Sequence, residues 1–307
     1  MFATLFRPKR ELEPMDKRVN LSSEILQFHP FYQRNTRLNH KAIAFLDKQP
    51  ASIKADPITQ CHMAISLFHE MLETENPLFR QEFLSQAEHI LNKVEVWEMA
   101  GKMCGVIPHR YHPGSQNLAS DPWISCQTQG WGMSIFMRAY QLTQKDSFRE
   151  AALSLAQPFL IESVNGGLRK KEKTGRIFYQ KLPFHGLHQH ILNGFLSSLV
   201  GLHELHQATS DGLAADLFGQ GLETVCTDEV LQTFDIGYSS IYGQLYQSAS
   251  PACIAYNRVH VWQLAALSIL SGYPQLNFWA AKWHQYTTSI PHRTFAKRDC
   301  LVYRLNW

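Results

Sequence analysis

Apolar residues recur every three or four positions through most of the chain after residue 56, which is the spacing of one buried helix face. The first two apolar runs follow helix-start signals. Asp56 and Asn76 can each cap a helix with a side-chain oxygen, and each stands directly before a proline that suits the first helical position. The pattern therefore predicts helices over about residues 57–73 and 77–94.

Six more helices are predicted from the same reasoning. The fourth should begin at a capping box formed by Ser147 and Glu150, while Asn257 and Gly272 should start and end the seventh. The predicted ranges of these six helices are about 122–143, 147–160, 191–205, 211–227, 257–272 and 275–289.

The connections between the helices alternate between short and long. Within each pair only a few residues intervene, so the two helices must run antiparallel as a hairpin. Between pairs the connections span about 95–121, 161–186 and 228–256, which is long enough to expect a function there. All long connections then emerge at one end. The predicted fold is all-α: a toroid of about four helical hairpins, with a cleft at that end.

A small β-hairpin is expected inside one of the long connections. Residues 168–171 and 176–180 read as two strands that flank the turn EKTG. We assign residues 56–290 to the toroid, 1–55 to an N-terminal extension packed on it, and 291–307 to a C-terminal tail.

Composition narrows the classes of function. A net charge of +3 fits an anionic ligand but lacks the dense basic face of nucleic-acid binders, so no nucleic-acid partner is expected. The six cysteines are scattered, which predicts reduced thiols. The first residues lack the apolar run of a signal peptide, and no apolar segment is long enough for a membrane span. We expect a soluble, cytoplasmic protein; its oligomeric state stays open, with a homodimer as one form.

Two histidine-rich stretches, HGLHQH (185–190) and HRYH (109–112), raise the question of a metal. No acidic partner stands at helical spacing beside them, and nothing resembles the His-Glu-x-x-His pattern of zinc enzymes. Phosphate-binding loops and Rossmann glycine patterns are also absent from the sequence. We therefore expect neither a metal nor a cofactor.

The inner helices of such a toroid would present their N-termini to the cleft. Free N–H groups and the positive ends of the helix dipoles converge there, which favours a carboxylate or sulfate. A basic run in the predicted β-hairpin would add to this charge, although such a run can equally be a solvated face. The residues that open the third, fifth and seventh helices are Trp123, Ser125, Gln127, His188, His190, Asn193, Tyr256, Arg258 and His260.

Four ordered blocks carry a more specific signal: PWISCQTQG (122–130), HILNGF (190–195), FDIGYSSIY (234–242) and YNRVHVWQL (256–264). Their order and intervals resemble the C-terminal catalytic domain of the D-glucuronyl C5-epimerases, over about residues 57–290. The resemblance implies an incomplete α/α toroid. It also implies an isomerase that acts on an anionic, uronate-containing glycan: the proton at C5 of a D-glucuronyl unit is removed and returned to the opposite face, giving an L-iduronyl unit.

Carried over block by block, the resemblance places catalytic phenols at Tyr242 and Tyr256. A phenol beside cations has its pKa of about 10 lowered, and its phenolate is a strong base. Arg258 and His260 would then neutralise the substrate carboxylate or polarise a phenol. Further substrate-binding candidates are Asn193, His190, Arg110, Trp123, Gln127 and Arg176.

One motif departs from the family pattern. Where the family carries a FEEYP-like motif whose Glu and Tyr are linked to activity, this chain reads FYQKLPF (178–184). Gln180, Lys181 and Leu182 occupy the matching places. Tyr179 stands next to them and is a candidate replacement for the missing phenol.

Two other functions stay open. A lyase would abstract the same proton and then lose the C4 substituent, so its unsaturated product would absorb in the ultraviolet. A non-catalytic glycan-binding or assembly protein would keep an anion-binding cleft after losing the chemistry. The replaced motif favours this last reading, whereas the retained Tyr242 and Tyr256 oppose it.

Overall fold

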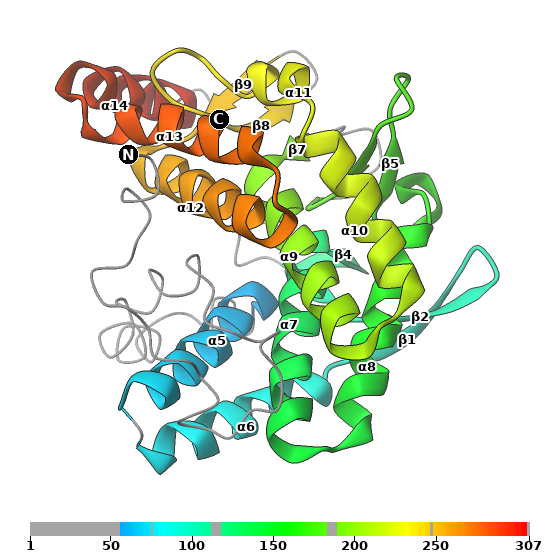
Figure 1. Cartoon of the computed structure of the whole chain (residues 1–307). Helices are drawn as coiled ribbons and strands as arrows, with labels where there is room; N and C mark the ends of the chain where they lie inside the picture. Colours follow the sequence, from blue (N-terminus) through cyan, green and yellow to red (C-terminus); the bar gives the residue numbers. More distant parts are fainter. Residues whose placement is uncertain (1–55, 75, 112–117, 183–188, 246–247, 306–307) are drawn as a thin grey trace.

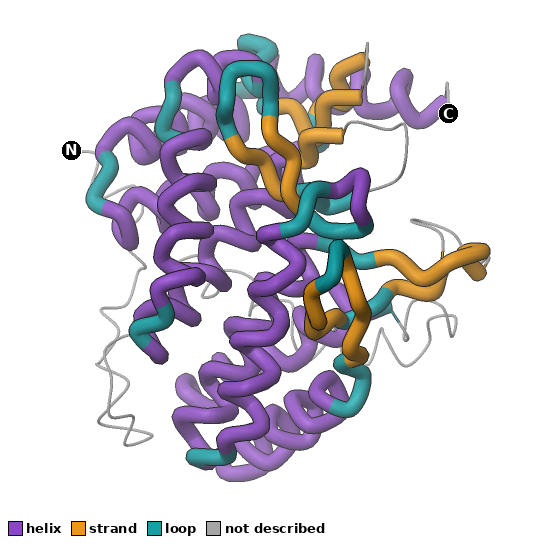
Figure 2. The backbone as a smooth tube through the Cα atoms, turned by 90° about the vertical axis from the view of Figure 1, so that its right-hand side faces the viewer, coloured by secondary structure: helices purple, strands orange, loops and turns teal. Residues whose placement is uncertain are grey.

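A computed structural model describes residues 56–74, 76–111, 118–182, 189–245 and 248–305. This part of the chain is mostly helical, with small antiparallel strand pairs at the ends of helices and no central sheet joining them (Figures 1 and 2). The expected N-terminal extension over 1–55 lies outside the described residues.

The predicted helices are confirmed, and they form four consecutive hairpins (Figure 1). The first members of the pairs contact one another in chain order: α5 packs on α7, α7 on α9, and α9 on α12. The toroid stays a prediction. The paired helices are α5 (Pro57–Thr74) with α6 (Pro77–Leu91), α7 (Cys126–Thr143) with α8 (Asp146–Ala156), α9 (Leu192–Thr209) with α10 (Gly212–Val225), and α12 (Ile254–Ser271) with α13 (Pro274–Thr288).

The first two helix starts follow the predicted chemistry. An oxygen of the Asp56 carboxylate accepts a hydrogen bond from the backbone N–H of Thr59 at 2.9 Å. Asn76 does the same for Leu78 at 3.0 Å. These side chains satisfy N–H groups that have no partner within the helix, which is why α5 and α6 begin there.

Two other predicted caps are wrong. Ser147 lies inside α8, whose start has no side-chain cap. Asn257 lies buried inside α12, where its amide accepts from Ser240 N at 2.9 Å and donates to Trp283 O at 3.0 Å. A capping side chain and a buried tertiary hydrogen bond need the same residue types, so the local pattern alone does not separate them.

The long connections contain more strands than the single hairpin predicted. That hairpin is confirmed as β5 (Arg169–Lys171) and β6 (Ile177–Tyr179), with Arg169 opposite Tyr179. The additional strands are β1 (Glu95–Met99), β2 (Lys102–Val106), β3 (His109–Tyr111), β4 (Leu118–Trp123), β7 (Gln189–Ile191), β8 (Ile241–Leu245) and β9 (Ser248–Pro251). Strand β4 occupies the start that we predicted for the third helix. Strand β8 pairs with both β7 and β9, which joins two connections that are far apart in sequence.

Two helices lie outside the predicted set. The short helix α11 (Asp228–Thr233) precedes β8, and α14 (Ile290–Leu305) occupies most of the segment that we had treated as a tail. None of the helices in the described ranges is long and apolar enough to cross a membrane.

Helices α7 and α9, whose N-terminal ends border the site, are in close backbone contact. A Cβ atom added to Gly201 would lie 2.2 Å from the carbonyl oxygen of Gly130, so the two backbones meet with no room for a side chain. A buried ion pair also joins the helices: Arg138 donates two hydrogen bonds to Glu204, at 2.7 and 2.9 Å. Losing one member of such a pair costs about 3–5 kcal/mol, so the relative position of α7 and α9 is strongly constrained.

Candidate functional site

Lys181 lies where the N-terminal ends of α7 and α9 meet. The preceding carbonyl, that of Gln180, accepts a hydrogen bond from the backbone N–H of Cys126, the first residue of α7. The stem of Lys181 lies against the first turn of α9, where a Cβ atom on Gly194 would be 2.7 Å from the Cβ of Lys181. Glycine at position 194 therefore leaves the space along which the lysine side chain runs.

The end of this side chain reaches both tyrosines that the sequence singled out. Lys181 Nζ donates a hydrogen bond to the hydroxyl of Tyr242 at 3.0 Å and lies 5.3 Å from the centre of its ring. The ring centroids of Tyr242 and Tyr256 are 4.5 Å apart, and each phenol shifts the pKa of the other. We call Lys181, Tyr242 and Tyr256 the phenol–lysine cluster. It unites the segment after β6 with β8 and α12.

Desolvation by the surrounding protein atoms dominates the electrostatics of this cluster, although Lys181 and Tyr242 are only half-buried and Tyr256 is 38% exposed. Desolvation raises the pKa of Tyr242 above that of an ordinary phenol, although Tyr256 acts to lower it. Desolvation likewise raises the pKa of Tyr256, against the charge of Lys181. The pKa of Lys181 is lowered by burial. Our expectation of a phenol with a lowered pKa is therefore wrong for the free protein, because desolvation outweighs the neighbouring cation.

His62 on α5 faces the same region and was not singled out by sequence. Its side chain is exposed, and its ring meets the buried Trp131 edge-on, with centroids 4.8 Å apart. Surrounding protein atoms desolvate the ring enough to lower its pKa to about 4; Asp56 acts to raise this value and the charge of Lys181 to lower it. The imidazole is therefore neutral at neutral pH. Helical periodicity predicts that His62 lies on a helix, but it does not predict which residues of other elements lie near its side chain.

His260 is not the cation that we expected. Its ring is fully buried, its Nδ1 lies 2.8 Å from Ser240 Oγ, and burial together with the charge of Lys181 lowers its pKa to about 3. Nε2 has no hydrogen-bond partner among the described residues. The same is true of two other buried atoms, Asn193 Oδ1 and Gln127 Oε1. Buried polar atoms normally have partners, so these three atoms are exceptions within the described part of the chain.

Arg258 lies on a different face of α12 from Tyr256. Two residues along an α-helix correspond to a rotation of about 160° the short way round, so the two side chains leave the helix in nearly opposite directions. Arg258 is exposed. Tyr256 and Arg258, although close in the sequence block, therefore do not belong to one binding surface.

Three other predicted substrate contacts have acidic partners. His190 Nε2 lies 2.9 Å from a carboxylate oxygen of Glu172, within the β5–β6 connection. The remaining two pairs are Arg176 with Glu229 at 2.9 Å and Arg110 with Glu95. Arg110 and Arg176 are already neutralised by a carboxylate, and the structure brings none of the three residues into the phenol–lysine cluster.

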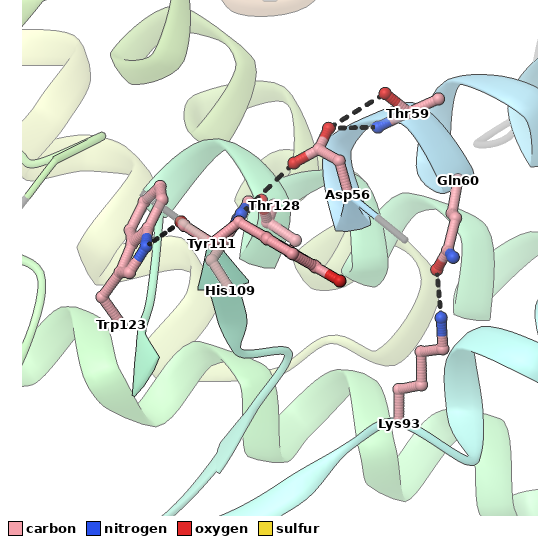
Figure 3. Close-up of polar contacts among 8 residues, drawn as sticks. All are labelled: Asp56, Thr59, Gln60, Lys93, His109, Tyr111, Trp123 and Thr128. Carbon is pink, nitrogen blue, oxygen red and sulfur yellow. Dashed lines mark hydrogen bonds and ion pairs between the residues drawn. The ribbon is translucent and has the colours of Figure 1, made fainter. Parts of the chain in front are cut away.

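Trp123 belongs to a separate polar network, shown in Figure 3. The buried His109 lies with Nε2 2.7 Å from Thr128 Oγ1 and with Nδ1 3.4 Å from the Asp56 carboxylate. Trp123 stacks on this imidazole at 4.1 Å and donates its indole N–H to Tyr111 O at 2.9 Å. We call Asp56, His109, Thr128 and Trp123 the histidine network. It fastens the start of α5 to β3, β4 and α7.

Tyr179 lies in the core. Its side chain is fully buried, its hydroxyl donates to Leu217 O at 2.7 Å, and its ring meets Phe159 edge-on at 4.9 Å. Burial raises its pKa far above that of a free phenol. Tyr179 therefore packs in the core, and we do not propose it as the replacement for the missing tyrosine.

Comparison with known sequences identifies the family. The family model described as D-glucuronyl C5-epimerase C-terminus matches residues 103–285, which is more than half of the chain. The chain belongs to this family. The resemblance drawn from the four sequence blocks is confirmed, and Lys181, Tyr242 and Tyr256 all lie within the matched range. The first helical hairpin, which carries Asp56 and His62, lies before it.

A relative of this epimerase-family chain is the D-glucuronyl C5-epimerase of Caenorhabditis elegans, which is 28% identical over 180 residues. The alignment covers 53% of this chain and 29% of the worm protein. The chain thus spans less than a third of that relative.

Among the described residues of this epimerase-family chain, no group of three or more His, Cys, Asp or Glu side chains could hold a metal ion. Three of the histidines that raised the question, His112, His185 and His188, lie outside the described residues. What the site offers chemically is two phenols, an amine with a lowered pKa and a neutral imidazole.

Proposed function

We propose that the chain is a C5-epimerase-like isomerase that converts D-glucuronyl to L-iduronyl units in a uronate-containing polysaccharide. The observation that carries this proposal is the phenol–lysine cluster inside the family region, because proton abstraction next to a carboxylate needs a base and a cation at one place. We further propose that the four helical hairpins form an incomplete α/α toroid, with this site at the end from which the long connections emerge.

Within this proposal, Tyr242 is the base. Its oxygen accepts a hydrogen bond from Lys181, and Tyr256 acts to lower its pKa, so both neighbours would stabilise the phenolate. Burial lowers the pKa of Lys181 and raises that of Tyr242, so the proton they share is sensitive to any charge that enters. A bound uronate carboxylate favours the ammonium form of Lys181. The shared proton then lies on Lys181, which leaves Tyr242 as the phenolate that removes the C5 proton.

A lyase is the second candidate, and the contact between the two phenols favours it. With the two rings in contact, both hydroxyls would act from one side of a bound sugar, and a β-elimination needs proton transfers on one side only. The two reactions share the first step and differ in the product. Ultraviolet absorbance of an unsaturated uronate would appear with a lyase and not with an epimerase.

The test is hydrogen exchange at C5. The chain is incubated in D2O with heparosan, a glucuronate-containing polysaccharide, and NMR follows loss of the C5 proton and appearance of iduronyl signals. We expect both with the natural chain, and a loss of roughly 10²–10⁴-fold in the rate with Tyr242→Phe, the usual contribution of a general base.

Tyr273→Phe is the matched control, because this phenol is exposed at the start of α13. Its exchange rate should equal that of the natural chain. If heparosan binds to the natural chain and its C5 proton stays unexchanged, the proposed reaction is wrong and the cleft is a binding site.

A further inference from the structure

The two phenols cannot serve opposite faces of a sugar in the arrangement that the structure shows. Their ring centroids are only 4.5 Å apart, which leaves no space for a pyranose ring between them. Inversion at C5 needs a second proton-transfer group on the other face. That group must come from a different element, must be accessible, and must exist in two protonation states.

The groups that share electrostatic interactions with Lys181 are the candidates for this second role. Cys126 is fully buried, and its Sγ donates to Tyr179 O at 3.4 Å. His260 is fully buried as well. Both carboxylate oxygens of Asp56 have partners, in the cap of α5 and in the histidine network.

His62 meets the requirements. His62 projects from α5, which packs on α7, whereas the phenols come from β8 and α12. Its ring is exposed, and Trp131 on α7 orients it through an edge-on contact. Lys181 is common to both sides, because its charge acts on His62 and also on Tyr256.

We infer that His62 is the proton-transfer group for the face of the sugar opposite the phenols. This inference rests on the proposed function. Tyr242, as phenolate, takes the proton from C5, and the electron pair left on C5 is delocalised into the carboxylate that Lys181 neutralises. His62, as imidazolium, then gives a proton to the other face. One proton is removed and one is returned; exchange with water restores the phenolate and the imidazolium.

An anionic substrate prepares His62 for this step. In the free protein desolvation holds its pKa at about 4, so the ring is neutral. A uronate carboxylate bound near the ring favours its charged form and raises that pKa toward neutrality. The imidazole can then carry a proton when substrate is present.

The experiment separates abstraction from inversion. The full chain and its His62→Gln variant are incubated with heparosan in D2O, and NMR measures deuterium at C5 in glucuronyl and iduronyl units separately. The variant should still exchange the C5 proton with retention of configuration, because the phenol face is intact. Its rate of forming iduronyl units should fall by roughly 10²–10⁴-fold.

His89→Gln is the matched control, because His89 is exposed on α6 and should leave both rates unchanged. Thermal unfolding checks that both variants fold. If the His62→Gln variant forms iduronyl units at the natural rate, the assignment of His62 is wrong. If the folded variant loses both exchange and inversion, the assignment is also wrong, because His62 would then act on the phenol face or in binding. Absence of exchange in the natural chain overturns the proposed function, and the inference falls with it.

Discussion

The phenol–lysine cluster and the histidine network lie at the same end of the helical hairpins, yet they are built in opposite ways. In the histidine network every polar group that we described has a partner: both oxygens of Asp56, both ring nitrogens of His109, and the hydroxyl of Thr128. In the phenol–lysine cluster desolvation disfavours the charged forms, and one nitrogen of the neighbouring His260 has no partner among the residues that the structure describes.

This difference separates a structural site from a functional one. A satisfied buried network stabilises the fold, whereas desolvated groups with shifted pKa values are typical of sites that await a ligand. Asp56 illustrates the first case: burial alone would raise its pKa, but His109 and Thr59 together hold it below the ordinary value. This distinction predicts that variants in the phenol–lysine cluster change activity and that variants in the histidine network change stability. The opposite result in either region would contradict it.

The largest expected effect is on activity. Lys181→Met removes the cation that neutralises the substrate carboxylate and stabilises the Tyr242 phenolate, while its thioether chain still fits against Gly194. We expect C5 exchange with heparosan to fall by roughly 10²-fold or more, comparable to the loss of a preorganised donor. The free energy of unfolding should stay the same or rise, because a desolvated amine is removed.

Lys171→Met, at the exposed end of β5, is the matched control and should keep the natural exchange rate. A large loss of stability in Lys181→Met, with activity retained in the folded fraction, would place Lys181 among the structural residues and remove the contrast between the two regions.

The next effect is on stability and concerns the histidine network. His109→Phe keeps a ring that can stack on Trp123 but leaves the hydroxyl of Thr128 buried without its partner. We expect the free energy of unfolding in urea to fall by about 1–3 kcal/mol, the cost of an unsatisfied buried polar group. Exchange per folded molecule should change little. A variant as stable as the natural chain but inactive would show that this network takes part in the chemistry.

The smallest effect tests the phenol that we placed in the core. Tyr179→Phe removes one hydrogen bond to Leu217 O and keeps the ring against Phe159. A loss of about 1 kcal/mol in the free energy of unfolding is expected, with no change in C5 exchange. Loss of exchange at unchanged stability would instead return Tyr179 to the site as the replacement for the family's tyrosine.

Sequence reasoning predicted much of the fold. Helical periodicity, caps and short links located the hairpins, because the buried face and the ends of an amphipathic helix can be recognised from its local sequence. The extra strands were missed because each is only three to six residues long. Strands β7, β8 and β9 also depend on pairing with one another more than on their own composition.

The site was predicted only in part. Tyr242 and Tyr256 were named from the family blocks, and the structure places their rings in contact. Lys181 was noticed only as a departure from the family motif, and His62 was not noticed, since spacing on a helix says which face a residue occupies and not what lies opposite. The direction of the tyrosine pKa shift was wrong because burial, which outweighs the neighbouring cation, is a property of the folded chain.

The sequence by itself determined the helices, their pairing and the family, since each depends on local periodicity or on ordered motifs that survive without knowledge of contacts. The tertiary structure alone decided which cations are already paired, as Arg110 and Arg176 are, and which one reaches the phenols. The physical reason is that desolvation and hydrogen-bond partnership arise between elements remote in sequence. Lys181 acquires its role because α7, α9, β8 and α12 meet around it.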